Sequence, residues 1–234
     1  ARVPYGSKST DSVLKYTRQC ADKLVAADVK ALVIACNTAA SVGTEVLRAS
    51  YPNIPIIGVI EPGASAAVSH TKNGHVAVIA TESTIAAGSY VRAIHALNPD
   101  IEVRTSACSL FVSLAEEGWV DGSLVEAILA RYLNPLFQDP EHHPDTLVLC
   151  CTHYPVLKAA IANVVGPRIQ LVDSANTTAG QLKVALTELG LLQDEASVGR
   201  LQCWVTDGPE RFIRVARLFL GHELDPNLVQ LVDL

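Results

Sequence analysis

Short runs of consecutive aliphatic residues alternate along this chain with longer amphipathic stretches, and turn-forming residues separate most of them. Aliphatic runs without polar alternation are typical of strands that are covered on both faces, as in parallel sheets. The pattern therefore predicts an α/β fold in which helices flank mostly parallel sheets. The strands are expected at residues 31–35, 56–60, 76–80, 101–104, 147–150, 169–172 and 201–205.

The amphipathic stretches predict helices between these strands. Several begin with Ser, Thr or Asp, whose side chains can cap the free N–H groups of a first helical turn. The expected helices include residues 11–27, 84–97, 123–133, 155–165, 178–189 and 209–220.

Composition narrows the class of protein. A chain of 234 residues can form one large domain or two lobes of about 100 residues each. Its 49% of apolar residues is ample for a packed core, whereas its net charge of -6 offers no basic surface to nucleic acid or to an anionic membrane. No apolar run approaches the roughly 20 residues of a membrane span. We expect a small molecule or a protein as partner, with no nucleic acid and no membrane.

Six cysteines are spread over the chain, and residues 1–6 lack the apolar core of a secretory signal. A chain this rich in aliphatic residues does not need disulfides, so a reducing cytoplasm is the expected location. The adjacent pair Cys150 and Cys151 lacks the spacing of zinc ligands, and we therefore predict no metal site.

Two of the cysteines occupy matching positions. Residues 32–38 (LVIACNT) can be laid over residues 147–153 (LVLCCTH), each reading as strand, cysteine and polar turn. Two similar lobes or a chance match between apolar strands would both give this pattern. In α/β sheets, ligands bind at the carboxyl ends of the strands, which is where Cys36 and Cys151 fall. A helix beginning there would lower the pKa of a thiol and would attract a carboxylate.

Polar residues follow both of these cysteines. Asn37 and Thr38 come after Cys36, whereas Thr152 and His153 come after Cys151, and His153 is placed to act as its acid or base partner. Buried cysteine is also a common small hydrophobic residue, and a redox-disulfide or acyl-enzyme role would use thiols too. Packing alone is the prediction for Cys20, Cys108, Cys150 and Cys203.

Three segments carry a family resemblance. Residues 32–39 (LVIACNTA), 55–63 (PIIGVIEPG) and 147–155 (LVLCCTHYP) resemble the diagnostic blocks of the glutamate racemase family, within the aspartate/glutamate racemase superfamily. Further blocks resemble it in the same order, so that the match covers almost the whole chain. They are residues 3–6 (VPYG), 80–85 (ATESTI), 114–118 (LAEEG) and 171–174 (LVDS).

The resemblance implies a two-lobed α/β fold with the active site in the cleft between the lobes. One lobe would comprise residues 1–61 together with 174–234, and the other residues 62–173. It also implies cofactor-independent racemisation of glutamate, which supplies D-glutamate for peptidoglycan. Cys36 would take the α-proton from D-glutamate and Cys151 from L-glutamate.

The resemblance further implies roles for ten neighbours of these thiols. His153 would assist Cys151, and Glu116 would position His153. Taken alone, Tyr5 also reads as a surface residue, Thr81 and Thr84 as a helix start, and Glu116 as a solvated carboxylate. The residues implied to contact the substrate are Pro4, Tyr5, Gly6, Asn37, Thr38, Thr81, Thr84 and Thr152.

The chain departs from the family pattern in several places. The family begins with a strand ending in Asp-Ser-Gly, whereas this chain opens just before its block at residues 3–6, which leaves a missing start or a non-catalytic binding protein open. Ser109 and Ser113 stand where relatives often have proline. Cys150 replaces a glycine and is expected to crowd the turn or offer a competing disulfide. An aspartate or hydantoin racemase is the close alternative, and a homodimer is left open.

Overall fold

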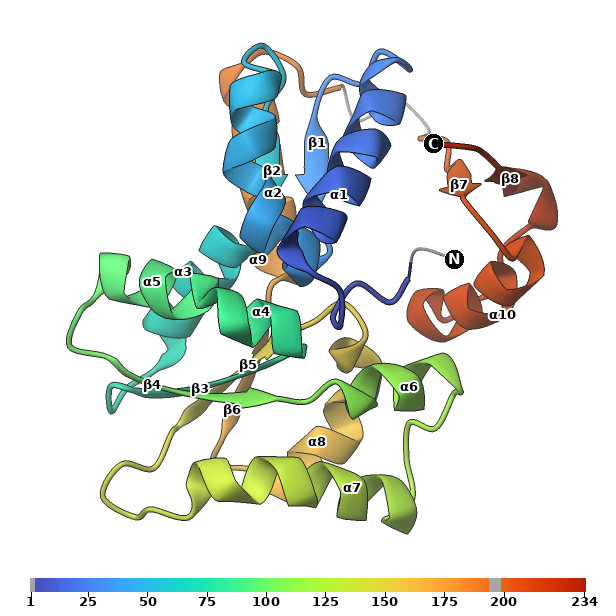
Figure 1. Cartoon of the computed structure of the whole chain (residues 1–234). Helices are drawn as coiled ribbons and strands as arrows, with labels where there is room; N and C mark the ends of the chain where they lie inside the picture. Colours follow the sequence, from blue (N-terminus) through green and yellow to red (C-terminus); the bar gives the residue numbers. More distant parts are fainter. Residues whose placement is uncertain (1–2, 194–198) are drawn as a thin grey trace.

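The computed structural model describes residues 3–193 and 199–234. Within these residues the strands form three sheets, and every strand pair is parallel. Helices lie on both faces of the largest sheet (Figure 1). The predicted α/β class, with parallel sheets flanked by helices, is therefore confirmed.

The first sheet has two strands, β1 (Leu32–Ile34) and β2 (Ile56–Gly58). Two helices pack beside it, α1 (Thr10–Val25) and α2 (Asn37–Ser50), and Ser9 caps the first by accepting a hydrogen bond from the Ser12 N–H. A small separate core joins these elements. Its buried members are Ala21, Leu32, Leu47 and Ile56.

The second sheet has four strands in the order β4-β3-β5-β6. Its two central strands are almost entirely buried because helices cover both of their faces, which explains their unbroken aliphatic sequences. The strands are β3 (His75–Ala80), β4 (Glu102–Ala107), β5 (Thr146–Cys150) and β6 (Gln170–Asp173).

Two groups of helices enclose this sheet (Figure 1). One core cluster lies beneath α3 (Ile60–His70) and α5 (Ser89–Leu97). The other lies on the opposite face, under helices that follow β4 and β5 in the chain. Those helices are α6 (Leu110–Glu116), α7 (Ser123–Leu133), the 3-10 turn η1 (Asn134–Phe137) and α8 (Lys158–Val165).

Local backbone chemistry changes three of the predicted elements. The helix predicted at residues 84–97 is two helices, α4 (Glu82–Ala87) and α5, because Gly88 adopts the left-handed conformation with φ 63°. The helix predicted from Pro155 starts instead as a 3-10 turn, η2 (Tyr154–Leu157), before α8. The strand predicted at residues 56–60 stops at Gly58, since α3 already begins at Ile60.

The C-terminal part comprises α9 (Ala175–Glu188), β7 (Cys203–Val205), α10 (Pro209–Leu220), η3 (Pro226–Leu228) and β8 (Val229–Leu231). Strand β7 pairs with β8, which the sequence did not indicate, in a third sheet. None of the helices in the described residues combines the length and the apolar character needed to cross a membrane. The lobe boundaries at residues 61/62 and 173/174 stay a prediction.

Candidate active site

Cys36 lies at the entrance to α2, just after β1. It is the N-cap residue of that helix, and its side chain is partly buried. Burial raises the pKa of the Cys36 thiol, whereas hydrogen bonds from the backbone N–H groups of Ala39 and Thr38 act in the opposite direction. The first turn of α2 therefore supplies the donors that would stabilise a thiolate here.

Cys151 follows directly after β5 and is only 8% exposed. Burial raises the pKa of its thiol to about 12, a backbone hydrogen bond from His153 opposes this, and the charge of Cys36 raises it further. Cys36 and Cys151 are distant in sequence and follow strands of different sheets, yet they are close enough for the charge of Cys36 to raise the pKa of Cys151. Two thiolates side by side are disfavoured, so a thiolate at one position favours a thiol at the other.

A chain of polar contacts leads away from Cys151. Its Sγ lies 3.8 Å from His153 Nδ1, and His153 Nε2 lies 2.8 Å from Glu116 Oε1. The other carboxylate oxygen of Glu116 accepts a hydrogen bond of 3.0 Å from Arg211 of α10. The Phe219 ring packs edge-on against His153 at 5.6 Å between centroids. The structure thus brings Cys151, His153 and Glu116 into one chain of contacts, to which Arg211 and Phe219 of α10 are added.

A cavity of about 340 Å³ is lined by residues of β1, by residues at the ends of β5 and β6, and by residues of α9. Asn37 lines it from the Cys36 side, and Cys151 and Thr152 line it from the other side. The Tyr90 hydroxyl donates to Asn37 Oδ1 at 2.7 Å, which leaves the Asn37 NH₂ group to donate elsewhere. Asp173 and Ser174, at the end of β6, also line this cavity, although the sequence singled out neither as a site residue.

Three buried threonines form a closed ring of hydroxyl groups. Thr38 Oγ1 lies 2.9 Å from Thr81 Oγ1 and 3.0 Å from Thr84 Oγ1, and the last two are 3.1 Å apart. Each hydroxyl can donate one hydrogen bond and accept one inside the ring, which leaves each oxygen with one further lone pair. The ring ties the start of α2 to the start of α4.

The N-terminal segment reaches this ring through Gly6. The Ser83 N–H and the Ser83 hydroxyl both donate to the Gly6 carbonyl, at 3.0 and 2.8 Å. A Cβ atom on Gly6 would lie 2.5 Å from the Thr81 Cβ, so only glycine fits this approach. Tyr5 is partly buried with its ring 5.9 Å from that of Tyr16, and Pro4 is exposed.

The other cysteines and the unusual residues have structural places of their own. None of the six cysteines, which all lie in the described residues, is joined to another in a disulfide, and Cys108 and Cys150 are fully buried in the core. Cys150 therefore fits beneath Cys151 without the disulfide that its position suggested. The Ser109 hydroxyl accepts a hydrogen bond of 3.2 Å from the Glu82 N–H, and Ser113 is exposed.

Known proteins are similar to this chain in sequence over most of its length. The sequence model of the family described as Asp/Glu/Hydantoin racemase matches residues 1–182. A glutamate racemase from Geobacter metallireducens is 46% identical over 224 residues, which are 96% of this chain and 82% of that protein.

Solved structures are similar over the whole described fold. The crystal structure of glutamate racemase isoform RacE1 from Bacillus anthracis has a TM-score of 0.92 and 34% identity, covering 100% of this chain and 85% of that one. The glutamate racemase from Francisella tularensis, crystallised in complex with D-glutamate, has a TM-score of 0.89 and 35% identity, covering 99% and 84%.

Proposed function

The chain belongs to the family of Asp/Glu/Hydantoin racemases, and we propose that it interconverts L-glutamate and D-glutamate with Cys36 and Cys151 as the two acid/base groups. The single observation that carries this proposal is the convergence of two thiols, each following a strand of a different sheet, upon one region where the charge of Cys36 raises the pKa of Cys151. Racemisation requires such a pair, because one face of the α-carbon loses a proton while the opposite face gains one.

The proposed reaction moves two protons. The Cys151 thiolate takes the α-proton of L-glutamate, and the Cys36 thiol delivers its own proton to the opposite face, so that D-glutamate leaves behind a Cys36 thiolate. The reverse reaction exchanges these roles. Burial keeps both resting thiols protonated, and the ammonium group of bound glutamate is a cation that would favour one thiolate.

Cys151 would be assisted by the groups behind it. His153 Nδ1 faces the sulfur at 3.8 Å, and Glu116 holds the opposite ring nitrogen, which fixes the orientation of the imidazole. His153 can then accept the thiol proton as the thiolate forms, with the resulting imidazolium stabilised by the Glu116 carboxylate. Arg211 would act as a positioning residue, since it touches Glu116 and not the cysteine.

The substrate carboxylate needs hydrogen-bond donors, because removal of the weakly acidic α-proton develops negative charge on that group. The Asn37 NH₂ group is a donor next to Cys36, and we assign it this task. Thr38, Thr81, Thr84 and Thr152 would bind the rest of the amino acid. Gly6, with Tyr5 and Pro4, would close the pocket over the threonine ring.

The test is to incubate the chain with D-glutamate and to follow its circular dichroism. We expect the signal to decay toward zero as the racemate forms, and we expect Cys36→Ser and Cys151→Ser each to slow the decay about 10³-fold. Parallel reactions with aspartate and hydantoins decide the substrate class. Calorimetric binding of glutamate to a folded chain that gives no turnover would instead identify a non-catalytic binding protein.

We also propose that the D-glutamate supplies peptidoglycan synthesis in the cytoplasm. The mechanism needs two reduced thiols, and the cytoplasm keeps thiols reduced. The homodimer and the lack of a nucleic-acid partner stay predictions.

A further inference from the structure

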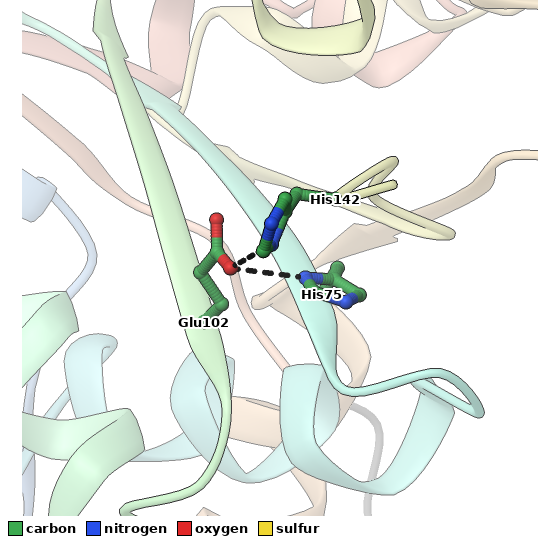
Figure 2. A group of neighbouring side chains, drawn as sticks. All are labelled: His75, Glu102 and His142. Carbon is green, nitrogen blue, oxygen red and sulfur yellow. Dashed lines mark hydrogen bonds and ion pairs between the residues drawn. The ribbon is translucent and has the colours of Figure 1, made fainter. Parts of the chain in front are cut away.

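Three side chains with metal-binding atoms converge at the edge of the four-stranded sheet, outside the site described above. They are His75 on β3, Glu102 on β4 and His142 in the loop between η1 and β5, and one ligand atom from each lies within 4.8 Å of the others (Figure 2). Glu102 Oε2 is the central atom. His142 Nδ1 lies 2.6 Å from it and His75 Nδ1 lies 3.5 Å from it.

His75 Nδ1 is the least satisfied of these atoms. It is shielded from solvent and has no hydrogen-bond partner, since its contact with Glu102 at 3.5 Å has ion-pair distance without hydrogen-bond geometry. A buried polar atom without a partner is costly, so its presence beside a carboxylate and a second imidazole calls for an explanation. A metal ion bound to the nitrogen lone pair would satisfy it.

The backbone holds two of these residues in place. His75 and Glu102 are direct partners in the parallel register of β3 and β4, so their side chains project from neighbouring strands. The His75 N–H donates to Asn73 Oδ1, and the Asn73 amide donates to the His143 carbonyl at 2.9 Å, which links the strand start to the loop.

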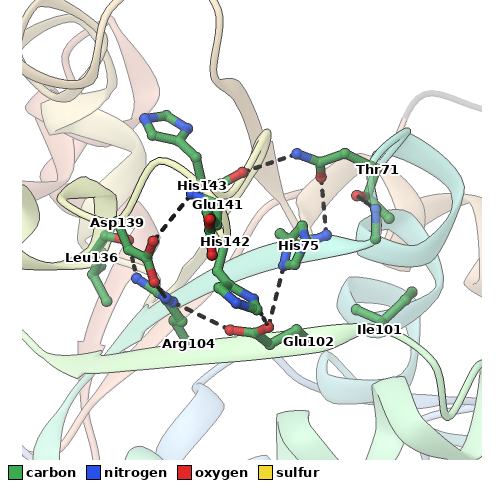
Figure 3. A network of polar contacts seen from close by, with 12 residues as sticks. Thr71, His75, Ile101, Glu102, Arg104, Leu136, Asp139, Glu141, His142 and His143 are labelled. Carbon is green, nitrogen blue, oxygen red and sulfur yellow. Dashed lines mark hydrogen bonds and ion pairs between the residues drawn. The ribbon is translucent and has the colours of Figure 1, made fainter.

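The loop that carries His142 is anchored on both sides of it. On one side, Arg104 of β4 donates to Asp139 at 3.0 Å, and Asp139 in turn accepts from the Glu141 N–H (Figure 3). On the other side, Asp145 accepts hydrogen bonds from the N–H groups of Lys72 and Asn73. Hydrogen bonds on both sides of His142 thus hold this loop next to Glu102, although the His142 side chain is 48% exposed.

We propose that His75, Glu102 and His142 form a binding site for a divalent zinc ion that ties this loop to the edge of the sheet. Two imidazoles and one carboxylate are a common zinc donor set, and the exposed side of His142 leaves room for a water as fourth ligand. In tetrahedral zinc sites neighbouring ligand atoms are about 3.4 Å apart, as His75 and Glu102 already are. His142 would have to withdraw from Glu102 by about 0.8 Å and take up the same spacing from His75, whose ligand atom already lies within 4.8 Å of its own.

The site lies away from the thiols. His75 begins β3 and Thr81 follows its end, so the length of one strand, about 20 Å, separates this cluster from the threonine ring. The proposed zinc is therefore structural and takes no part in racemisation. Substitution of His142 should leave the reaction rate unchanged.

The test is a titration of the tag-free chain with zinc chloride by isothermal calorimetry. It is done in a Cys36→Ser/Cys151→Ser background, so that the proposed catalytic thiols cannot bind the metal. We expect one zinc ion per chain, and we expect His142→Gln and His75→Gln each to weaken binding at least tenfold. His143→Gln is the matched control, because His143 is adjacent in sequence but its Nδ1 faces the Pro144 carbonyl.

Two further measurements keep the result interpretable. Zinc should raise the melting temperature of the background protein and of His143→Gln, but not that of His142→Gln. A cooperative melting transition of His142→Gln with a chelator present would show that this variant folds. Cobalt in place of zinc should give visible bands without the near-ultraviolet charge transfer of thiolate ligation. Equal zinc affinity of His142→Gln and His143→Gln, or thiolate bands with cobalt, would overturn the proposal.

Discussion

Cys36 and Cys151 have matching positions after a strand, but their surroundings differ. Backbone N–H groups at the start of α2 serve Cys36, together with the hydroxyl of Thr38. Cys151 is served by a side-chain relay through His153 and Glu116 that extends to Arg211. The hydrogen bonds to Cys36 therefore come from the first turn of one helix, whereas the side chains behind Cys151 come from three separate segments.

In the proposed mechanism, a reaction that is symmetric between two enantiomers would use two thiols with different surroundings. The two enantiomers have equal energy, so kcat/KM must fall equally in both directions whatever residue is changed. A residue that serves only one thiol instead changes which proton transfer limits the rate. Isotope effects with α-deuterated L- or D-glutamate report this separately for each thiol.

The largest effect is expected from the thiols themselves. Cys36→Ser and Cys151→Ser should each lower racemisation about 10³-fold, because a serine hydroxyl is a far weaker acid. In D₂O, Cys36→Ser should still exchange the α-proton of L-glutamate, and Cys151→Ser that of D-glutamate, as measured by NMR. The opposite pattern would reverse the assignment of the two faces.

His153→Asn changes the surroundings of Cys151 and leaves those of Cys36 unchanged. We expect kcat/KM to fall about 10²-fold in both directions, as for loss of an acid/base group. The isotope effect should grow with α-deuterated L-glutamate and shrink with α-deuterated D-glutamate, since transfer at Cys151 becomes limiting. Thr38→Val, on the Cys36 side, should show the reverse trend, and an equal change for both enantiomers would contradict a role confined to Cys151.

The burial of Cys151 predicts a dependence of stability on pH. Its pKa is raised from 9.0 to about 12, so the folded state keeps a proton that the unfolded state loses above pH 9. The stabilisation is complete below pH 9 and is lost as the pH rises toward 12, with about 1.4 kcal/mol gone at pH 10. Urea unfolding measures the free energy of unfolding at pH 8 and at pH 10. The decrease between these two pH values should be smaller by this amount in Cys151→Ser than in the unchanged protein. Equal decreases in the free energy of unfolding in the two proteins would contradict this contribution of Cys151.

Arg211→Met is expected to have the smallest effect. Its ion pair with Glu116 is solvent-accessible, and such pairs contribute about 1 kcal/mol or less, so kcat/KM should fall about threefold. The isotope effects should shift in the same direction as in His153→Asn. Arg214→Met, an exposed position on the same helix, is the control and should change neither quantity. A shift of equal size in both variants would rule out positioning through Glu116.

The sequence was most informative where function coincides with local structure. Cys36 and Cys151 could be singled out because strand ends and helix starts are encoded by neighbouring residues. Arg211 could not, because its contact with Glu116 joins residues 95 positions apart on exposed helical surfaces. The short strand β8 was missed for a similar reason, since its three residues have too little pattern to distinguish them from a loop.

The cluster of His75, Glu102 and His142 is a second case in which contacts between distant residues could not be predicted from local sequence patterns. The sequence predicted no metal site, because only cysteine and closely spaced histidine patterns were available as signals. Strand register brings His75 to Glu102, and a braced loop brings His142 to both. The distances between these three residues along the sequence do not indicate any of these contacts.

The most direct test of the two-thiol account is racemisation of each enantiomer in D₂O, stopped at low conversion. If two opposed thiols act, the newly formed enantiomer carries deuterium at the α-carbon, whereas the recovered substrate retains hydrogen, and this holds from either direction. Transfer of the substrate's own α-hydrogen into the product would mean that a single group serves both faces, and it would contradict the account.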